Sequence, residues 1–253
     1  MNIVVCAKQI PDPNLKPELD GDRLKRAGVA AVLDEGDEYG VEAALQLAEA
    51  HGGEVTVVSM GPESAMEAVR KALSMGAHKG ILVSDDSLAG ADALATARVL
   101  AAAIKRVEFD LVITAVESTD GYSGVVPQML AEFLGIPNAT FAKSLEVADG
   151  TLKINRQTEK GYDVVETPLP ALVTVTAGAN EPRYPSFKGI VGAKSKPVDQ
   201  LSVGDLEIDG GVAPTQSVAN IEEAAKRGAG EVVEDDGTGA ERIAAFLAEK
   251  KVI

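Results

Sequence analysis

Cysteine, histidine, tryptophan and basic charge are all scarce in this sequence. Cys6 is the only cysteine, which excludes an internal disulfide and any cysteine-caged zinc or iron–sulfur site. The two histidines, His51 and His78, lie far apart, and we interpret both as solvent-exposed helix ends. A histidine-based metal site or a Ser/His catalytic pair therefore has little support. Aromatic residues make up only 4% of the chain, so its own side chains are not expected to stack on an aromatic cofactor.

The overall charge is strongly acidic. Lysine and arginine number 24 against 39 acidic residues, a formal net charge of −15, which argues against a nucleic-acid partner because basic patches supply most of that affinity. No run approaches the roughly 20 consecutive apolar residues of a membrane helix. Residues 1–8 also lack the order of a secretory signal, a basic segment followed by a long apolar one. We predict a cytoplasmic protein without membrane insertion.

The first half of the chain alternates short apolar runs with helical patterns. The runs predict strands covered by helices on both faces; they are Ile3–Ala7, Val55–Met60, Gly80–Ser84 and Leu111–Val116. Between them, helical periodicity appears at Val41–Ala48 and Leu94–Ile104, and Ser64–Glu67 has the form of a capping box that opens a helix. Cys6, inside the first run, is interpreted as a buried structural thiol. This alternation predicts right-handed βαβ units in a doubly wound parallel sheet.

The second half is richer in strands and ends in a helix. Strands joined by short turns are predicted at Asn138–Val147, Thr151–Gln157, Tyr162–Thr167 and Leu172–Thr176. A long irregular stretch rich in Gly, Pro and Lys follows from Ala177. The tail Gly239–Lys250 predicts one helix with Ile243, Phe246 and Leu247 on its apolar face. We interpret this helix as reaching across to another chain.

A ligand is expected where the strand order of the sheet reverses, at the carboxyl ends of the first and fourth strands. The two loops at that point are Lys8–Pro13 and Glu117–Val126. The second loop has glycines that let the backbone approach a ligand, and its amides precede a helix that can receive a phosphate. The same residues are also typical of a simple helix cap. The GxGxxG and GxxxxGK[ST] patterns are absent, which excludes ordinary dinucleotide and P-loop sites. The acidic pairs Asp85-Asp86 and Asp235-Asp236 are interpreted as solvated turns, so no metal site is predicted.

Six segments, in order along nearly the whole chain, resemble the electron-transfer flavoprotein beta subunit family. They are Ile3–Asp12, Val32–Glu35 with Glu38–Ala44, Met60–Pro62, Arg70–Ala77, Thr167–Val175 and Asn180–Ile190. The resemblance implies a Rossmann-like α/β fold of adenine-nucleotide-binding type, with a β-rich second half, a long recognition loop (residues 180–197) and a C-terminal helical arm. Residues 1–200 would form the nucleotide-binding domain, and 201–253 the arm that packs on an alpha subunit.

The resemblance also implies an electron carrier without catalytic residues of its own. The alpha subunit would hold most of an FAD, and the beta subunit would bind AMP structurally. The pair would pass electrons from acyl-CoA and related dehydrogenases to a membrane quinone oxidoreductase. The residues implied to contact the cofactors are Cys6, Asp34, Asp37, Met60, Ala115, Ser118, Gly121, Ser123, Gly124, Val125 and Val126, with Pro13 approaching the edge of the flavin ring.

The recognition loop is implied to dock the dehydrogenase through Tyr184, Phe187, Lys188 and Ile190, with Phe187 as the apolar anchor. The alternative for Phe187 is a side chain folded onto the base of its own loop. Lys188, Lys194 and Lys196 form a basic stretch in an otherwise acidic chain. In the nucleotide loop, by contrast, no lysine or arginine is present, so backbone amides at 123–126 are expected to hold the phosphate.

The nucleotide loop departs from the family pattern. Many members have an Asp-rich loop or Gly-Arg-Gln-Ala-Ile-Asp-Gly-Asp, whereas residues 115–124 here read Ala-Val-Glu-Ser-Thr-Asp-Gly-Tyr-Ser-Gly. Electron-bifurcating members hold a second FAD in place of AMP; the missing Arg-Gln pair favours AMP. A nucleotide-sensing module would lack Pro182–Ile190 and the arm. An adenylating ligase would need a pyrophosphate-binding loop after the first strand, which Lys8–Pro11 does not supply.

Overall fold

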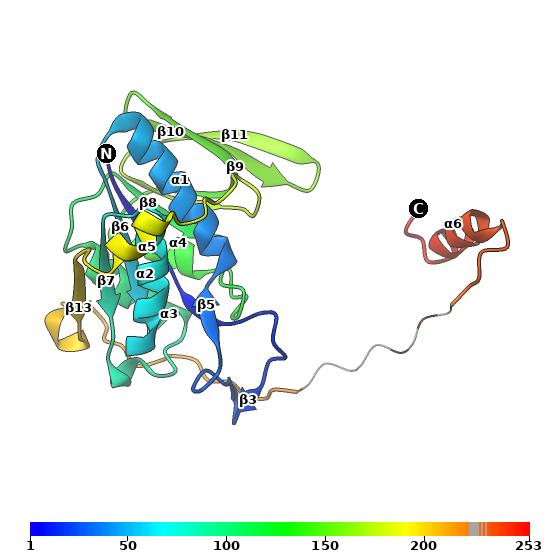
Figure 1. Cartoon of the computed structure of the whole chain (residues 1–253), viewed down its shortest axis with the longest axis horizontal. Coiled ribbons are helices and arrows are strands. Elements are labelled where there is room, and N and C mark those ends of the chain that lie inside the picture. Colours follow the sequence, from blue (N-terminus) through cyan, green and yellow to red (C-terminus); the bar gives the residue numbers. More distant parts are fainter. Residues whose placement is uncertain (223–227, 229, 231) are drawn as a thin grey trace. The chain divides into compact units, whose positions relative to one another are not determined.

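The computed structural model describes residues 1–222, 228, 230 and 232–253. The chain forms two compact units, Met1–Ala219 and Asn220–Ile253, and each is described by itself (Figure 1). The first unit is built on a nine-stranded sheet with the order β11-β10-β9-β12-β8-β1-β6-β7-β13. All neighbours in this sheet are parallel except β9–β10 and β10–β11, which are antiparallel hairpins. The predicted parallel α/β sheet with a β-rich second half is confirmed.

The strands of this sheet are β1 (Asn2–Cys6), β6 (Glu54–Met60), β7 (Lys79–Val83), β8 (Leu111–Ala115), β9 (Asn138–Ala148), β10 (Thr151–Thr158), β11 (Gly161–Pro168), β12 (Ala171–Val175) and β13 (Val198–Leu201). Two small antiparallel pairs lie outside it: β2 (Gln9–Pro11) with β5 (Ala31–Leu33), and β3 (Leu19–Asp20) with β4 (Arg23–Leu24).

Helices cover both faces of the parallel part of the sheet. They are α1 (Glu35–His51), α2 (Met66–Met75), α3 (Ala93–Ile104), α4 (Val126–Leu134) and α5 (Phe187–Ala193), with 3-10 turns at Glu63–Ala65, Asp86–Leu88 and Val203–Asp205. Alternate residues of β1 point to opposite faces of the sheet. Ile3 and Val5 pack in the core that contains α1 and α2, and Val4 packs in the core that contains α3 and α4. This two-sided burial explains why the central strands are continuously apolar.

Two sequence expectations for the first unit were wrong in detail. The capping box at Ser64–Glu67 does not form, because Glu63–Ala65 makes a 3-10 turn and α2 then starts at Met66 without a side-chain cap. The stretch after Ala177 is not irregular throughout, because it contains α5 and β13, and β13 extends the sheet beside β7. His51 does end α1 and is exposed; His78 is exposed ahead of β7, where its Nδ1 accepts a hydrogen bond from the Val55 N–H at 3.0 Å.

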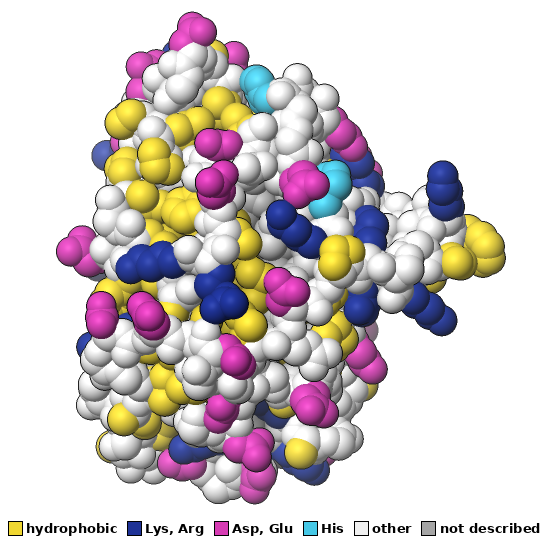
Figure 2. Space-filling model, turned by 90° about the vertical axis from the view of Figure 1, so that its left-hand side faces the viewer, with side chains coloured by type: hydrophobic (Ala, Val, Ile, Leu, Met, Phe, Trp, Pro, Cys, Tyr) yellow, Lys and Arg dark blue, Asp and Glu magenta, His cyan; other side chains and the backbone are white. Residues whose placement is uncertain are grey.

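The second unit contains α6 (Gly239–Glu249), close to the predicted helix. Within this unit Ile243 and Phe246 are 63% and 56% exposed, so the apolar face of α6 is not covered by its own unit. Among the described residues, no helix is long and apolar enough to cross a membrane, and no group of three or more His, Cys, Asp or Glu residues could hold a metal ion. The face in Figure 2 mixes acidic, basic and apolar side chains without one continuous basic area.

Candidate functional site

The strand order reverses between β1 and β8, as the sequence predicted. From β1 the sheet grows through β6 and β7 on one side, and β8 lies against the other side of β1 in parallel register, with Ile3 opposite Leu111. The loops that leave the carboxyl ends of β1 and β8 therefore flank one crevice. We call these two loops, together with the turn Asp34–Asp37, the switch-point site.

Asp34 is the residue that joins the turn before α1 to the loop after β8. Its side chain is fully buried; Oδ1 accepts hydrogen bonds from the Gly36 N–H (3.0 Å) and the Thr119 hydroxyl (2.7 Å), and Oδ2 accepts one from the Thr119 N–H (2.7 Å). One carboxylate thus caps α1 and fixes the loop 117–126. Aspartate is suited to both tasks because its short side chain reaches nearby backbone donors.

Asp37, one turn into α1, holds the other loop. Its Oδ2 accepts a hydrogen bond from the Lys8 N–H at 2.7 Å, directly after β1. Burial raises the pKa of Asp37 well above its usual value, and the nearby Asp34 raises it further. Two buried carboxylates of one turn therefore each position one of the two loops of the switch-point site.

The nucleotide loop has no lysine or arginine of its own, but two basic side chains from other segments contact it. The Lys8 ammonium contacts the nearly buried Asp120 carboxylate (2.7 Å) and the Ser118 hydroxyl (3.1 Å), and Arg26 pairs with the other oxygen of Asp120. Burial opposes ionisation of Asp120, but these hydrogen bonds and charges hold its pKa below the usual value. The sequence analysis named the loops that contain Lys8 and Thr119 but not their contacts with Asp120 and Asp34, and it missed Arg26, because contacts between residues far apart in the chain leave no local pattern. The position of Lys8 next to the first strand was the available signal.

The loop 121–126 presents backbone donors at the start of α4. Gly121 and Tyr122 donate their N–H groups to the Ser118 carbonyl, and Tyr122 and Gly124 have positive φ angles of 47° and 62°. In the described part of the chain, the N–H groups of Ser123, Gly124, Val125 and Val126 donate to no protein acceptor. Four free donors at a helix N-terminus suit an anion, because the helix dipole adds positive potential there.

The other residues implied to contact cofactors lie at strand ends or on the adjacent surface. Cys6, Met60 and Ala115 end the three neighbouring strands β1, β6 and β8. Cys6 is half-buried; burial, with a smaller effect from Asp37, raises the pKa of its thiol to about 12, so the thiol stays protonated at neutral pH. Pro13 is exposed in the turn that follows β2.

The recognition loop presents apolar side chains to solvent. Tyr184 and Phe187 are 95% and 84% exposed, and Ile190 is half exposed on α5. Phe187 is therefore not folded onto the base of its loop. Lys188 is exposed, but Lys196 is not part of a basic surface, since its ammonium donates to the carbonyls of Leu73 (2.8 Å) and Ala77 (2.6 Å). A cavity of ≈ 580 Å³ is lined by residues of this loop and of α2.

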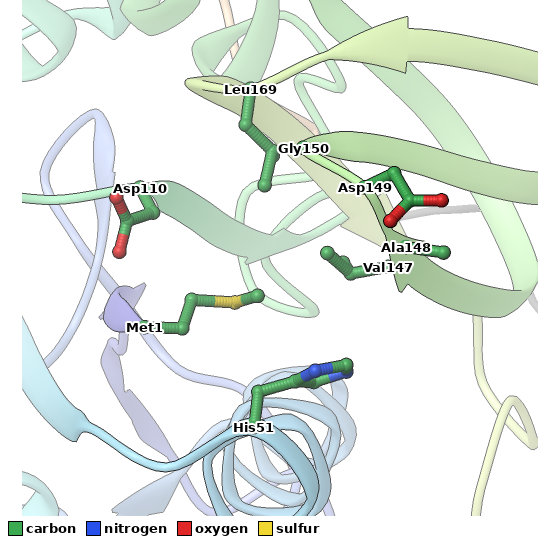
Figure 3. A pocket seen from close by; sticks show the side chains of 8 residues that line it. All are labelled: Met1, His51, Asp110, Val147, Ala148, Asp149, Gly150 and Leu169. Carbon is green, nitrogen blue, oxygen red and sulfur yellow. The ribbon is translucent and has the colours of Figure 1, made fainter.

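A second cavity, of ≈ 490 Å³, lies at the opposite, amino ends of the strands (Figure 3). It is lined by Met1, His51, Asp110, Val147, Ala148, Asp149, Gly150 and Leu169. Its main polar groups are already used by the fold, because the Met1 ammonium donates to the Gly52 carbonyl (2.6 Å) and Asp110 accepts from the Asn2 N–H (2.7 Å). We assign no function to it.

The chain is similar to proteins of one family over its whole length. The model of the electron transfer flavoprotein domain matches residues 23–206. A Mycobacterium leprae electron transfer flavoprotein subunit beta is 42% identical, with 100% of this chain and 99% of that protein covered. A Clostridium acetobutylicum protein of the same description is 40% identical over 83% of this chain and 81% of its own. The caffeyl-CoA reductase-Etf complex subunit CarD of Acetobacterium woodii is 36% identical, covering 99% and 97%. The chain therefore belongs to the electron transfer flavoprotein family and groups with its beta subunits.

Proposed function

We propose that this chain binds AMP at the switch-point site and, with an alpha subunit that holds most of an FAD, forms a cytoplasmic electron carrier. The observation that carries the AMP assignment is the set of four N–H groups at 123–126 that have no acceptor in the described structure. A phosphate monoester supplies several strong acceptor oxygens and negative charge, which these donors and the α4 N-terminus both favour. The adenosine would then extend between the ends of β1, β6 and β8.

The charges around these donors are of both signs, because a Glu117 carboxylate oxygen lies 3.3 Å from the place where a Cβ of Gly124 would sit, while Asp120 is paired with Lys8 and Arg26. The Asp120 carboxylate forms ion pairs with Lys8 and Arg26, which compensate its negative charge. The bound phosphate would therefore meet little uncompensated negative charge from Asp120. Arg26 also links the segment after β4 to this loop. Pro13, in the turn after β2, is proposed to approach the flavin edge.

The flavin, when bound, supplies the redox chemistry, and this chain supplies binding, orientation and docking. The proposed docking surface is Tyr184, Phe187, Lys188 and Ile190 of the recognition loop, directed at acyl-CoA dehydrogenase-type donors. Electrons would leave to a membrane quinone oxidoreductase. The exposed face of α6, with Ile243 and Phe246, is proposed to pack on the alpha subunit, which would remove this apolar area from water.

A second FAD in place of AMP is the alternative for the switch-point site. It is favoured by the similarity to CarD, a subunit of a caffeyl-CoA reductase-Etf complex. Against it, residues 115–124 lack the Arg-Gln pair of the pattern named above. An adenine-nucleotide-sensing module is a further alternative; an oligomeric state that depends on ATP would support that module.

The test is to co-express the chain with its alpha subunit, denature the pure complex, and quantify the released FAD and AMP. One FAD and one AMP per heterodimer is the expected result, whereas two FAD and no AMP would refute the AMP assignment. Gly124→Ala and Gly135→Ala are matched in backbone strain, because both glycines have positive φ (62° and 69°) and flank the two ends of α4; they differ in that a Cβ would meet Glu117 Oε2 at 3.3 Å at Gly124 and no atom within 4 Å at Gly135. Each alanine costs about 1–2 kcal/mol of backbone strain. Only Gly124→Ala, which distorts the amides at 123–126, is expected to release AMP; equal loss in both variants would contradict the proposed phosphate contact.

A further inference from the structure

The recognition loop has little regular structure ahead of α5, yet it carries the most exposed aromatic side chains of the first unit. Between Glu181 and Pro185, the hydrogen bonds made in the described structure are those of Arg183. Tyr184 follows Arg183 directly, and Phe187 begins α5 three residues later. The placement of this apolar surface therefore depends on how Arg183 is held.

Arg183 is held by two carboxylates of α1 that lie two helical turns apart. Its Nε and Nη2 donate to the two oxygens of Glu42 at 2.8 and 3.0 Å, its Nη1 and Nη2 donate to Glu49 at 2.5 and 3.1 Å, and its backbone N–H also donates to Glu42 at 3.2 Å. The Glu42 side chain is 4% exposed, while that of Glu49 is 60% exposed. Gln46 donates a further hydrogen bond to Glu42 at 2.9 Å. A planar guanidinium that meets both carboxylates through paired contacts has one favourable orientation.

The other end of the recognition loop is fastened to α2. Arg70 donates through Nη1 to the carbonyls of Ala193 and Lys196, both at 2.7 Å, and the Lys196 ammonium caps the carbonyl end of α2. The loop is thus attached to one helix at each end, by arginine and lysine side chains and not by a continuous strand or helix. Side chains between the two attachments are free to project into solvent without the loop itself moving.

We propose that Arg183 is a positioning residue for partner docking, which fixes Tyr184 and Phe187 in the orientation that the partner binds. This inference rests on the proposed docking function of the recognition loop. A loop ordered before binding loses less conformational freedom on association than a mobile one, so the clamp strengthens binding without touching the partner. Loss of the clamp is therefore expected to weaken binding of the dehydrogenase and to leave the flavin chemistry unchanged.

The first test needs no partner. In the intact heterodimer, Arg183→Gln is expected to increase amide hydrogen exchange at residue 183, Gly189 and Ile190 at least about tenfold, because these are the amides of residues 183–190 that have acceptors in the described structure and the Arg183 side chain holds that segment closed. Arg183→Lys keeps the charge but cannot make the paired contacts, so its exchange rates are expected to lie between those of the wild type and those of Arg183→Gln. Lys79→Gln, which breaks an exposed 3.0 Å ion pair with Glu54 away from the loop, is the control and should leave exchange there unchanged. Unchanged exchange in Arg183→Gln would overturn the proposal.

The second test uses an acyl-CoA dehydrogenase as the reductant of the heterodimer. Arg183→Gln is expected to raise the KM for the heterodimer about tenfold with kcat and FAD content unchanged, with partial recovery in Arg183→Lys. A fall in kcat at constant KM would overturn the positioning role. If Arg183→Gln fails to fold because it leaves Glu42 buried without its partner, Glu49→Gln removes only the exposed half of the clamp and should produce a smaller KM increase.

Phe187→Ala separates this inference from the proposed function beneath it. If Phe187→Ala leaves KM unchanged while Arg183→Gln loosens the loop, the clamp exists but the loop is not the docking surface, and the positioning role fails with it. If Phe187→Ala raises KM and Arg183→Gln does not, docking stands and the clamp is refuted. An increase of KM in both variants supports both the docking function of the loop and the positioning role of Arg183.

Discussion

The contact between α5 and α2 can be tested with two glycines of the same short helix. Gly189 lies against the carbonyl end of α2, and a Cβ at this position would overlap the Ser74 carbonyl oxygen, which is backbone and cannot rotate away. Gly192, three residues later, has no atom within 4 Å of the place where a Cβ would sit. The substitutions Gly189→Ala and Gly192→Ala therefore add the same methyl group to one helix, once against a neighbour and once into open space.

The expected magnitudes follow from these surroundings. To accept the Gly189→Ala methyl at van der Waals distance, α5 must retreat from α2 by about 1 Å, and such overpacking costs about 1–3 kcal/mol. Alanine also favours a helix over glycine by about 1 kcal/mol, and this gain applies to both variants. Gly192→Ala is thus expected to stabilise α5 slightly. The difference between the two variants should be about 1–3 kcal/mol, or roughly 5-fold to 150-fold in the opening equilibrium of α5.

Amide hydrogen exchange of residues 187–193 measures that opening directly. Faster exchange in Gly189→Ala than in wild type, with equal or slower exchange in Gly192→Ala, is the expected pattern. Because the retreat of α5 displaces Phe187 and Ile190, Gly189→Ala should also lower the affinity for any partner that binds this surface. The reasoning is refuted if both alanine variants protect the helix to the same degree.

Two further predictions concern titrating groups. Asp92 caps α3 and accepts hydrogen bonds from the Ala95, Thr215 and Gln216 N–H groups, which together lower its pKa to about 2. The ordinary pKa of an aspartate is about 3.9. The stability that the ionised Asp92 adds to the fold is therefore complete above about pH 3.9 and is lost as the pH falls toward 2. The amide signals of residues 215–216 should therefore shift between pH 4 and 2 in wild type, and Asp92→Asn should abolish the shift; an identical shift in Asp92→Asn would contradict the assignment. Cys6 is half-buried at the end of β1, and with its thiol pKa raised to about 12 it should react with a disulfide reagent at pH 8 more slowly than in the unfolded chain; equal rates in the folded and unfolded chain would contradict the raised pKa.

The local sequence pattern predicted the central sheet, because strands buried on both faces are continuously apolar. The runs Ile3–Ala7 and Leu111–Val116 became β1 and β8, and their order along the chain, with a helix after each, was enough to locate the reversal between them. By contrast, α5 was missed because its sequence has two glycines in seven residues and little amphipathic pattern. Gly189 allows α5 to approach α2 closely, a contact that no local pattern in the sequence shows.

The sequence by itself determined the fold class, the family, and the two loops that flank the reversal of strand order. Each of these depends on residues close together in the chain, or on motifs in a fixed order. Only the tertiary structure decided which charges meet: Lys8 with Asp120 across 112 residues, and Arg183 with Glu42 across 141. Such pairs leave no periodic signal, because a charged side chain in the sequence is as consistent with a solvated surface as with a specific partner. They form only after the sheet has brought the ends of distant strands and helices together.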